Sequence, residues 1–252
     1  MPQYLVAIDM GPRRARAVVL ETTFRSAQLV DAQTIDIDPE ADQAELKWRK
    51  VRKVLPKQID SVIVNIGASS ASTRLMNFPF EDQRKVEAAL DFELENQVPY
   101  DLDEIAVASI LAHKGGGKSG LLTALTPRDS IAAQIRNMKS ADLEPRSMVM
   151  TAGTLAELVP AETSGPTAVL SLGETEAHLA VVNDGLRFAR TIRAGGATVD
   201  RALAKKYKLD PEQAKHAKET EARLLLGDKE QESDEAREIS EAVATGLGAV
   251  LR

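Results

Sequence analysis

The chain has 252 residues, of which 43% are hydrophobic and 28% are charged, a balance typical of one large or two modest globular domains. The formal net charge of −6 gives no electrostatic reason to expect nucleic-acid binding, and the absence of cysteine excludes disulfides, thiol nucleophiles and cysteine metal sites. The sequence shows neither a signal-peptide pattern nor a run of roughly 20 apolar residues, so we expect a soluble, cytoplasmic chain.

The first part of the chain alternates strands with one helix. Apolar and β-branched runs predict strands at residues 4–8, 15–21, 27–37 and 61–67, and the composition of residues 41–55 predicts a helix. The run that ends at Gly67 is continuously apolar, which is typical of a central strand.

A series of a different kind follows. We expect a strand at 73–78, a helix at 81–97 that Pro99 ends, strands at 105–112 and 121–126, a helix at 129–140, a strand at 146–150 and a helix at 151–158. Asp129 or Thr126 is the expected cap of the helix at 129–140. This series predicts a small α+β unit, residues 73–144, inserted into a first half made of residues 1–72 and 145–163.

The remaining residues, 164–252, form the predicted second half. Strands are expected at 168–172, 177–182 and 186–192, and helices at 198–207, from Asp210-Pro211 onward, and at 230–252. Asn183-Asp184-Gly185 between two strands predicts a hairpin turn. Because the sequence ends without a cap or a polar tail, we expect this half to be truncated.

One pattern occurs twice, in residues 4–20 and again in residues 167–182, at a constant offset of 162 residues. Each copy is an apolar strand, a tight turn at a glycine and a second apolar strand. The equivalent pairs are Asp9 and Ser171, Gly11 and Gly173, Ala15 and Ala177, and Arg16 and His178. The repeat predicts two related halves whose turns face each other, an arrangement that binds phosphate in sugar kinases, heat-shock ATPases and actin.

The two turns carry only part of the chemistry of such a site. After Gly11 come Pro12, which has no amide proton, and two arginines where small residues are expected. In the second turn Ser171 replaces the aspartate that would hold a magnesium shell. Arg13, Arg14 and Arg16 remain as cations that can hold phosphate.

We therefore predict a degenerate nucleotide cleft with no catalytic residue, no metal site and no enzymatic activity, in which ATP with Mg²⁺ is a secondary expectation. The candidate binding residues are Asp9, Gly11, Arg16, Gly173, Thr175, Gly195 and Gly196. The last two precede a helix, whose first backbone amides can meet an anion.

The loop Lys114-Gly115-Gly116-Gly117-Lys118-Ser119 ends like a phosphate-binding loop. However, Ala112 stands where that motif needs glycine, and a strand rather than a helix follows, so we expect a hairpin loop. His113, His178 and His216 lie on different predicted elements, which predicts neither a metal cluster nor a catalytic triad.

The segment Gln97-Val98-Pro99-Tyr100-Asp101-Leu102-Asp103-Glu104 resembles the signature (Q)-(I/V)-P-(F/Y)-x-L-(D/E)-E of PilM and of the GspL cytoplasmic domain. Phe78-Pro79-Phe80, and Gly195-Gly196 with the helix that follows, fit the same family. The resemblance implies an α/β, actin-like fold of duplicated ribonuclease-H-like halves with an inserted α+β subdomain. It also implies a place at the inner face of the bacterial inner membrane.

The two branches of this family differ in function. PilM binds ATP and the N-terminal tail of PilN in type IV pilus assembly, whereas GspL anchors the assembly ATPase GspE in type II secretion and continues through a membrane helix. The PilM pattern Asp-x-Gly-Ser-Ser-Ser-x-Lys is Asp-Met-Gly-Pro-Arg-Arg-Ala-Arg from Asp9 to Arg16, and the second aspartate of the family is Ser171.

These departures favour the GspL interpretation, a non-catalytic scaffold of the type II secretion inner-membrane platform that recruits a GspE-like ATPase, with GspM or PilN as membrane partner and a homodimer as a further interaction. The alternative is a PilM-like protein that binds ATP and the tail of PilN. An active ATPase or sugar-kinase-like enzyme ranks last.

Overall fold

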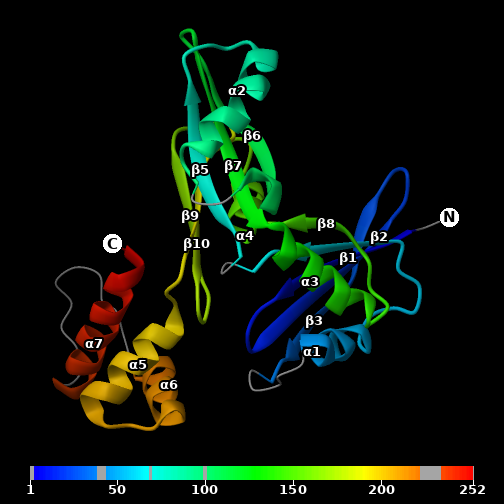
Figure 1. Ribbon diagram of the computed structural model, residues 1–252. Helices are drawn as coiled ribbons and strands as arrows, with labels where there is room; N and C mark the ends of the chain where they lie inside the picture. The colour runs from blue at the N-terminus through cyan, green and yellow to red at the C-terminus, as the bar shows by residue number, and fades with distance from the viewer. Residues whose placement is uncertain (1–2, 39–43, 68–69, 99–100, 222–233, 252) are drawn as a thin grey trace.

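The computed structural model describes residues 3–38, 44–67, 70–98, 101–221 and 234–251, and Figure 1 shows three sheets with helices packed beside them. The first sheet has five strands in the order β3-β2-β1-β4-β8. Its elements are β1 (Gln3–Met10), β2 (Arg14–Thr22), β3 (Ala27–Asp36), β4 (Ser61–Asn65) and β8 (Pro145–Val149). The pairs β1–β2 and β2–β3 are antiparallel, whereas β4 joins β1 and β8 in parallel.

The core of the first sheet lies between its strands and two helices, α1 (Ala44–Arg52) and α3 (Arg128–Lys139). Val6 and Val64 point into it from the strands, and Trp48 points into it from α1. Met138 of α3 is fully buried in the same core. The helix predicted at 129–140 therefore packs with the first half, although the predicted insert of residues 73–144 included it.

The start of α3 also differs from the prediction. Its N-cap is Pro127, without a side-chain hydrogen bond to the cap, so neither Asp129 nor Thr126 caps it. Pro127 has the extended backbone of the residue that precedes a helix, which its fixed φ allows, and it has no amide proton that needs a partner.

The inserted sheet has three antiparallel strands in the order β5-β7-β6. Its elements are β5 (Ser72–Phe78), α2 (Gln83–Glu95), the 3-10 turn η1 (Leu102–Glu104), β6 (Ile105–Gly115) and β7 (Lys118–Pro127). Helix α2 begins after Asp82, whose carboxylate accepts a hydrogen bond from the amide of Lys85, and it packs on the sheet through Val86, Leu90 and Leu94. The predicted helix stop at Pro99 lies outside the described residues.

The second half contains a three-stranded antiparallel sheet in the order β11-β10-β9 and a group of three helices. Its elements are α4 (Thr151–Thr154), the 3-10 turn η2 (Leu155–Leu158), β9 (Thr167–Leu172), β10 (Ala177–Val182), β11 (Leu186–Ile192), α5 (Gly196–Tyr207), α6 (Pro211–Thr220) and α7 (Asp234–Leu251). The predicted Asn183-Asp184-Gly185 turn is confirmed, with Asp184 at φ 50° and Gly185 at φ 104°. Residues 230–233 of the predicted last helix lie outside the described residues.

Strand β11 attaches the insert to the second half, because it contacts all three strands of the inserted sheet. The hydroxyl of Thr73 donates a hydrogen bond to the carbonyl of Ala189, and the guanidinium of Arg187 donates one to the carbonyl of Ala112. Ala112 and Ala189 also share a small apolar core with Leu122. None of the described helices is long and apolar enough to span a membrane.

Candidate functional site

The two repeated turns line opposite sides of one cleft with a volume of about 1090 Å³. The first side consists of residues at the turn between β1 and β2, and the second of residues at the turn between β9 and β10. Helices α5 and α6 contribute the rest of the lining. Of the seven predicted binding residues the cleft brings together Asp9, Gly11, Arg16, Gly173, Thr175 and Gly196.

The two turns have the same backbone geometry. The amide of Gly11 donates to the carbonyl of Arg14 at 3.0 Å, and the amide of Gly173 donates to the carbonyl of Glu176 at 2.9 Å. A Cβ atom on Gly11 would lie 2.8 Å from the first carbonyl oxygen, and one on Gly173 would lie 2.7 Å from the second. The predicted repeat is therefore present down to its hydrogen bonds, and both turns require glycine because a side chain would meet the backbone.

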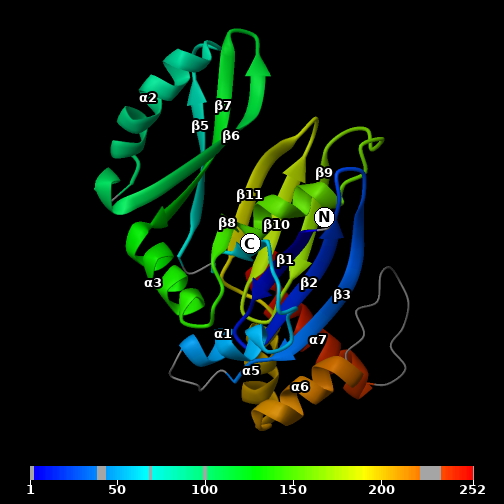
Figure 2. The ribbon, with the colours of Figure 1, turned by 90° about the vertical axis from the view of Figure 1, so that its right-hand side faces the viewer.

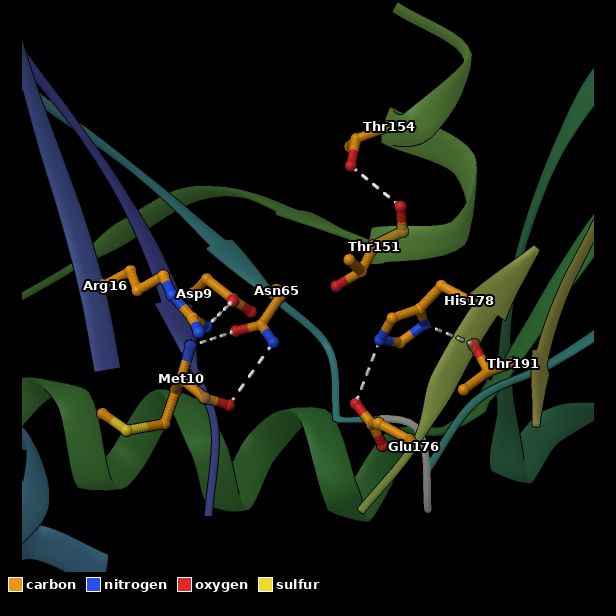
Figure 3. A network of polar contacts seen from close by, with 9 residues as sticks. All are labelled: Asp9, Met10, Arg16, Asn65, Thr151, Thr154, Glu176, His178 and Thr191. Atoms are coloured by element: carbon orange, nitrogen blue, oxygen red, sulfur yellow. Dashed lines mark hydrogen bonds and ion pairs between the residues drawn. The ribbon is translucent and has the colours of Figure 1, made fainter. Parts of the chain in front are cut away.

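In the first turn the candidate magnesium ligand already has a cationic partner. Asp9 and Arg16 stand opposite each other on β1 and β2, and their side chains form an ion pair with 3.4 Å between Oδ2 and Nη1 (Figure 3). A metal ion at this carboxylate would have to displace the guanidinium. Arg16 is thus engaged by a carboxylate of its own hairpin.

Asn65 holds the first turn against β4. Its Oδ1 accepts a hydrogen bond from the amide of Met10 at 2.7 Å, and its Nδ2 donates to the carbonyl of the same residue at 3.4 Å (Figure 3). The side chain is only 7% exposed, so these bonds satisfy a buried amide. Sequence reasoning missed this residue, although a polar side chain that ends the apolar run Ser61-Val62-Ile63-Val64 is a visible signal.

The second turn has an acid–base pair of its own. His178, the repeat equivalent of Arg16, has 3.3 Å between its Nε2 and the Oε1 of Glu176, and its Nδ1 lies 3.2 Å from the hydroxyl of Thr191. Figure 3 shows Thr151 of α4 between this group and the group around Asp9. His178 is buried and held by both of its ring nitrogens, which gives it a structural role in the second turn.

One ion pair crosses the cleft. The Nε of Arg13 in the first turn lies 2.8 Å from Oε1 of Glu174 in the second turn, and the two side chains are 49% and 35% exposed. The pair joins the two halves at the place where a phosphate would lie between the turns. Glu174 was not among the predicted site residues, because its partner is far away in the sequence.

The backbone amides that open α5 are also occupied. The amide of Gly196 donates to the carbonyl of Gly173 at 2.9 Å, and that of Ala197 donates to the carbonyl of Glu174 at 2.8 Å. These bonds start α5 two residues before the predicted position, Thr198. The two glycines therefore allow α5 to pack closely on the second turn, and these amides are not free to bind an anion.

The glycine-rich hairpin lies in the insert, outside the cleft. Gly116 and Gly117 have φ values of 63° and 76°, and the amide of Gly117 donates to a carboxylate oxygen of Glu81 at 2.6 Å. Strand β7 contains Lys118 and Ser119, so no helix start faces the loop. The predicted hairpin loop is confirmed. Within the described residues no group of histidine and acidic side chains is arranged to hold a metal ion.

Among the described residues, the lining of the cleft holds almost equal numbers of acidic and basic side chains, seven aspartates and glutamates and six arginines and lysines. Four ion pairs among them lie across or beside the turns, namely Asp9–Arg16, Arg14–Asp36, Arg13–Glu174 and Asp200–Lys218, and the carboxylate of Glu176 lies against His178. These pairs neutralise much of the charge beside the two turns, so an anion that binds there must compete with a carboxylate for Arg13, Arg14 or Arg16.

Comparisons with solved structures support the fold. The chain is similar to a chain of a PilM–PilN type IV pilus biogenesis complex, with 16% identity, a TM-score of 0.76, and coverage of 98% of this chain and 74% of that one. It is also similar to the cytoplasmic domain of EpsL, an inner-membrane component of the type II secretion system of Vibrio cholerae, with 12% identity, a TM-score of 0.55, and coverage of 96% and 95%. MreB5 of Spiroplasma citri bound to ADP has 11% identity and a TM-score of 0.51, over 99% of this chain and 76% of that one.

These likenesses confirm the predicted α/β, actin-like fold. No curated protein sequence matches the chain. The family model for the type IV pilus assembly protein PilM matches residues 16–225. Since that match spans most of the chain, the chain belongs to the PilM family. The predicted PilM/GspL resemblance is therefore confirmed.

Proposed function

We propose that this chain is a non-catalytic assembly protein of the type IV pilus, which holds the tail of a PilN-like partner at the inner face of the inner membrane. The observation that carries the proposal is the PilM family match over residues 16–225, together with the TM-score of 0.76 to a chain of the PilM–PilN complex. The ion pairs that fill the cleft support a role without catalysis.

The insert offers an edge strand for such a tail. Strand β6 is at the edge of the inserted sheet, so its outer backbone groups face away from β7. The side chains of Val107, Ile110 and Leu111 on this strand are exposed. An extended peptide can add to an edge of this kind through main-chain hydrogen bonds and place its apolar side chains against them.

Binding of a fluorescent peptide with the sequence of the cognate PilN tail tests the proposal. We expect saturable binding of this peptide and no binding of a scrambled peptide. Leu111→Glu should weaken the binding of the PilN tail about tenfold or more, because it places a charge on the apolar edge. Leu158→Glu is the matched control and should leave binding unchanged, since Leu158 is also well exposed, at 68% against 58% for Leu111, but lies in η2. Failure of the wild-type chain to bind the tail would overturn the proposal.

The cleft predicts the outcome of a nucleotide assay. With ATP and Mg²⁺ we expect no phosphate release above background, and Asp9→Ala should release phosphate at the same rate as wild type. The reason is that Asp9 is paired with Arg16, Pro12 cannot donate an amide proton, and Ser171 replaces the second aspartate. A rate that falls on Asp9→Ala would show that this carboxylate serves catalysis.

A GspL-like scaffold of type II secretion is the second candidate. The altered first turn and Ser171 favour it, as does the coverage of 95% of the EpsL cytoplasmic domain by this chain. A pull-down that compares the PilN tail with the N-terminal part of a GspE-like ATPase separates the two candidates. Retention of the ATPase alone would favour the second, and retention of neither would contradict both.

A further inference from the structure

Helix α2 of the insert has an outer face that no described element covers. Its inner face packs through Val86, Leu90 and Leu94, which leaves Phe92 pointing outward with 67% of its surface exposed. Asp91 and Glu95 are exposed too, and their spacing of four residues makes them neighbours on the helix surface, with Glu95 also three residues from Phe92. The face thus combines one large apolar side chain with carboxylates.

The charge of this region is one-sided. Residues 86–113 contain seven acidic residues and no lysine or arginine. Glu93 and Glu95 are in the last turn of α2, which has no basic residue, although the negative end of the helix dipole disfavours carboxylates there. Among the described residues neither Asp91 nor Glu95 has an ion-pair partner. A cation from outside the chain would therefore relieve repulsion within the face.

Helix α1 and the turn after it carry the complementary surface. Residues 47–57 contain six basic residues and no acidic one. Trp48 and Val51 point into the core, whereas Lys50 and Lys53 are exposed and lack an ion-pair partner among the described residues. Leu46 and Val54, exposed by 49% and 42%, frame these two lysines with apolar surface.

The two faces cannot meet within one molecule. In both views α2 lies at the top of the molecule, and α1 lies near the bottom (Figures 1 and 2). We infer that the acidic face of α2, centred on Phe92, binds the basic face of α1, centred on Lys50 and Lys53, on a second copy of this chain. The contact uses a different patch on each partner, so it leaves one free face at each end and continues head to tail.

A single helix–helix contact is small, and stable interfaces bury roughly 800 Å² on each partner. The association is therefore weak in dilute solution and grows where copies are held close together. Because it depends on exposed charges, it weakens as the Debye length falls from about 10 Å at 0.1 M salt to about 3 Å at 1 M.

Sedimentation velocity of the full chain tests the inference. From about 10 µM to about 1 mM protein, the range in which weak contacts form, we expect the weight-average sedimentation coefficient to rise at 0.05 M NaCl and to stay constant at 1 M. Asp91→Lys with Glu95→Lys should weaken the association about tenfold or more, and so should Lys50→Glu with Lys53→Glu, because each pair of changes opposes like charges. Glu157→Lys with Glu162→Lys, which makes the same change of charge at exposed sites away from both helices, should leave it unchanged.

Mixing the two reversed variants provides the decisive measurement. Each variant then meets opposite charges only on the other, so the mixture should associate again while either variant alone does not. A wild-type coefficient independent of concentration, or a mixture that stays monomeric, would overturn the inference. So would binding of anionic vesicles (phosphatidylglycerol) that Lys50→Glu with Lys53→Glu abolishes in a chain that does not self-associate, since the basic face would then serve a lipid surface.

Discussion

Gly195→Ala is expected to lower the free energy of unfolding by about 1–3 kcal/mol, as overpacking of a close contact does. A Cβ atom at this position would lie 2.5 Å from the carbonyl oxygen of Gly173 and 2.7 Å from that of Glu174. These oxygens accept the hydrogen bonds of Gly196 and Ala197, so moving them away also breaks the attachment of α5 to the second turn. Urea unfolding followed by circular dichroism measures the change.

Gly248→Ala is the matched control for this prediction. Gly248 lies in α7, and a Cβ atom there would meet no atom within 4 Å. Alanine in a helix interior is favoured over glycine by about 0.5–1 kcal/mol, so the same chemical change should raise stability here. If the two variants shifted the urea midpoint equally, the close approach of α5 to the turn would not be the reason for Gly195.

Leu203→Ala should cost more, about 2–5 kcal/mol, because it opens a cavity in a packed core. Leu203 is fully buried on α5, between α6 and α7, where it packs with Val199, Ala214 and Ile239. The helix group holds the wall of the cleft that carries Asp200 and Lys218, so we expect this wall to loosen together with the core. Thermal and urea unfolding report the loss.

Leu158→Ala serves as the control for the core substitution. Leu158 is 68% exposed at the end of η2, so its removal deletes the same atoms without leaving a cavity, and a change within about 0.5 kcal/mol is expected. A loss at Leu158 as large as that at Leu203 would contradict the packing of the helix group.

The elements of the fold could be predicted well because their signals are local. The apolar runs of β1, β4 and β10, and the turn at Asp184-Gly185, are patterns among neighbouring residues. The observed ends of an element differed from the predicted ends where a long-range contact decides where the element begins. Helix α5 starts at Gly196 because its first amides bind the carbonyls of the second turn, which lie more than twenty residues earlier.

The position of α3 shows that the order of elements along the chain does not by itself predict which core a helix joins. The series of strands and helices after residue 73 predicted this helix as part of the insert. In the structure Met138 is buried in the core of the first sheet, and Gln134 donates a hydrogen bond to the carbonyl of Asn65. A helix packs where its apolar face finds a matching surface, and sequence order alone does not select that surface.

Some features of the candidate site could be predicted from the sequence, and others depend on the tertiary structure. The sequence by itself determined the two turns, because a glycine between two apolar strands is a local pattern that occurs twice, and it determined that Pro12 and Ser171 depart from a phosphate site. Only the tertiary structure decided how the remaining charges are used. Arg13 and Glu174 are 161 residues apart and form a pair because the two halves bring their turns together. An ion pair across a cleft depends on distance in space, which local patterns do not contain.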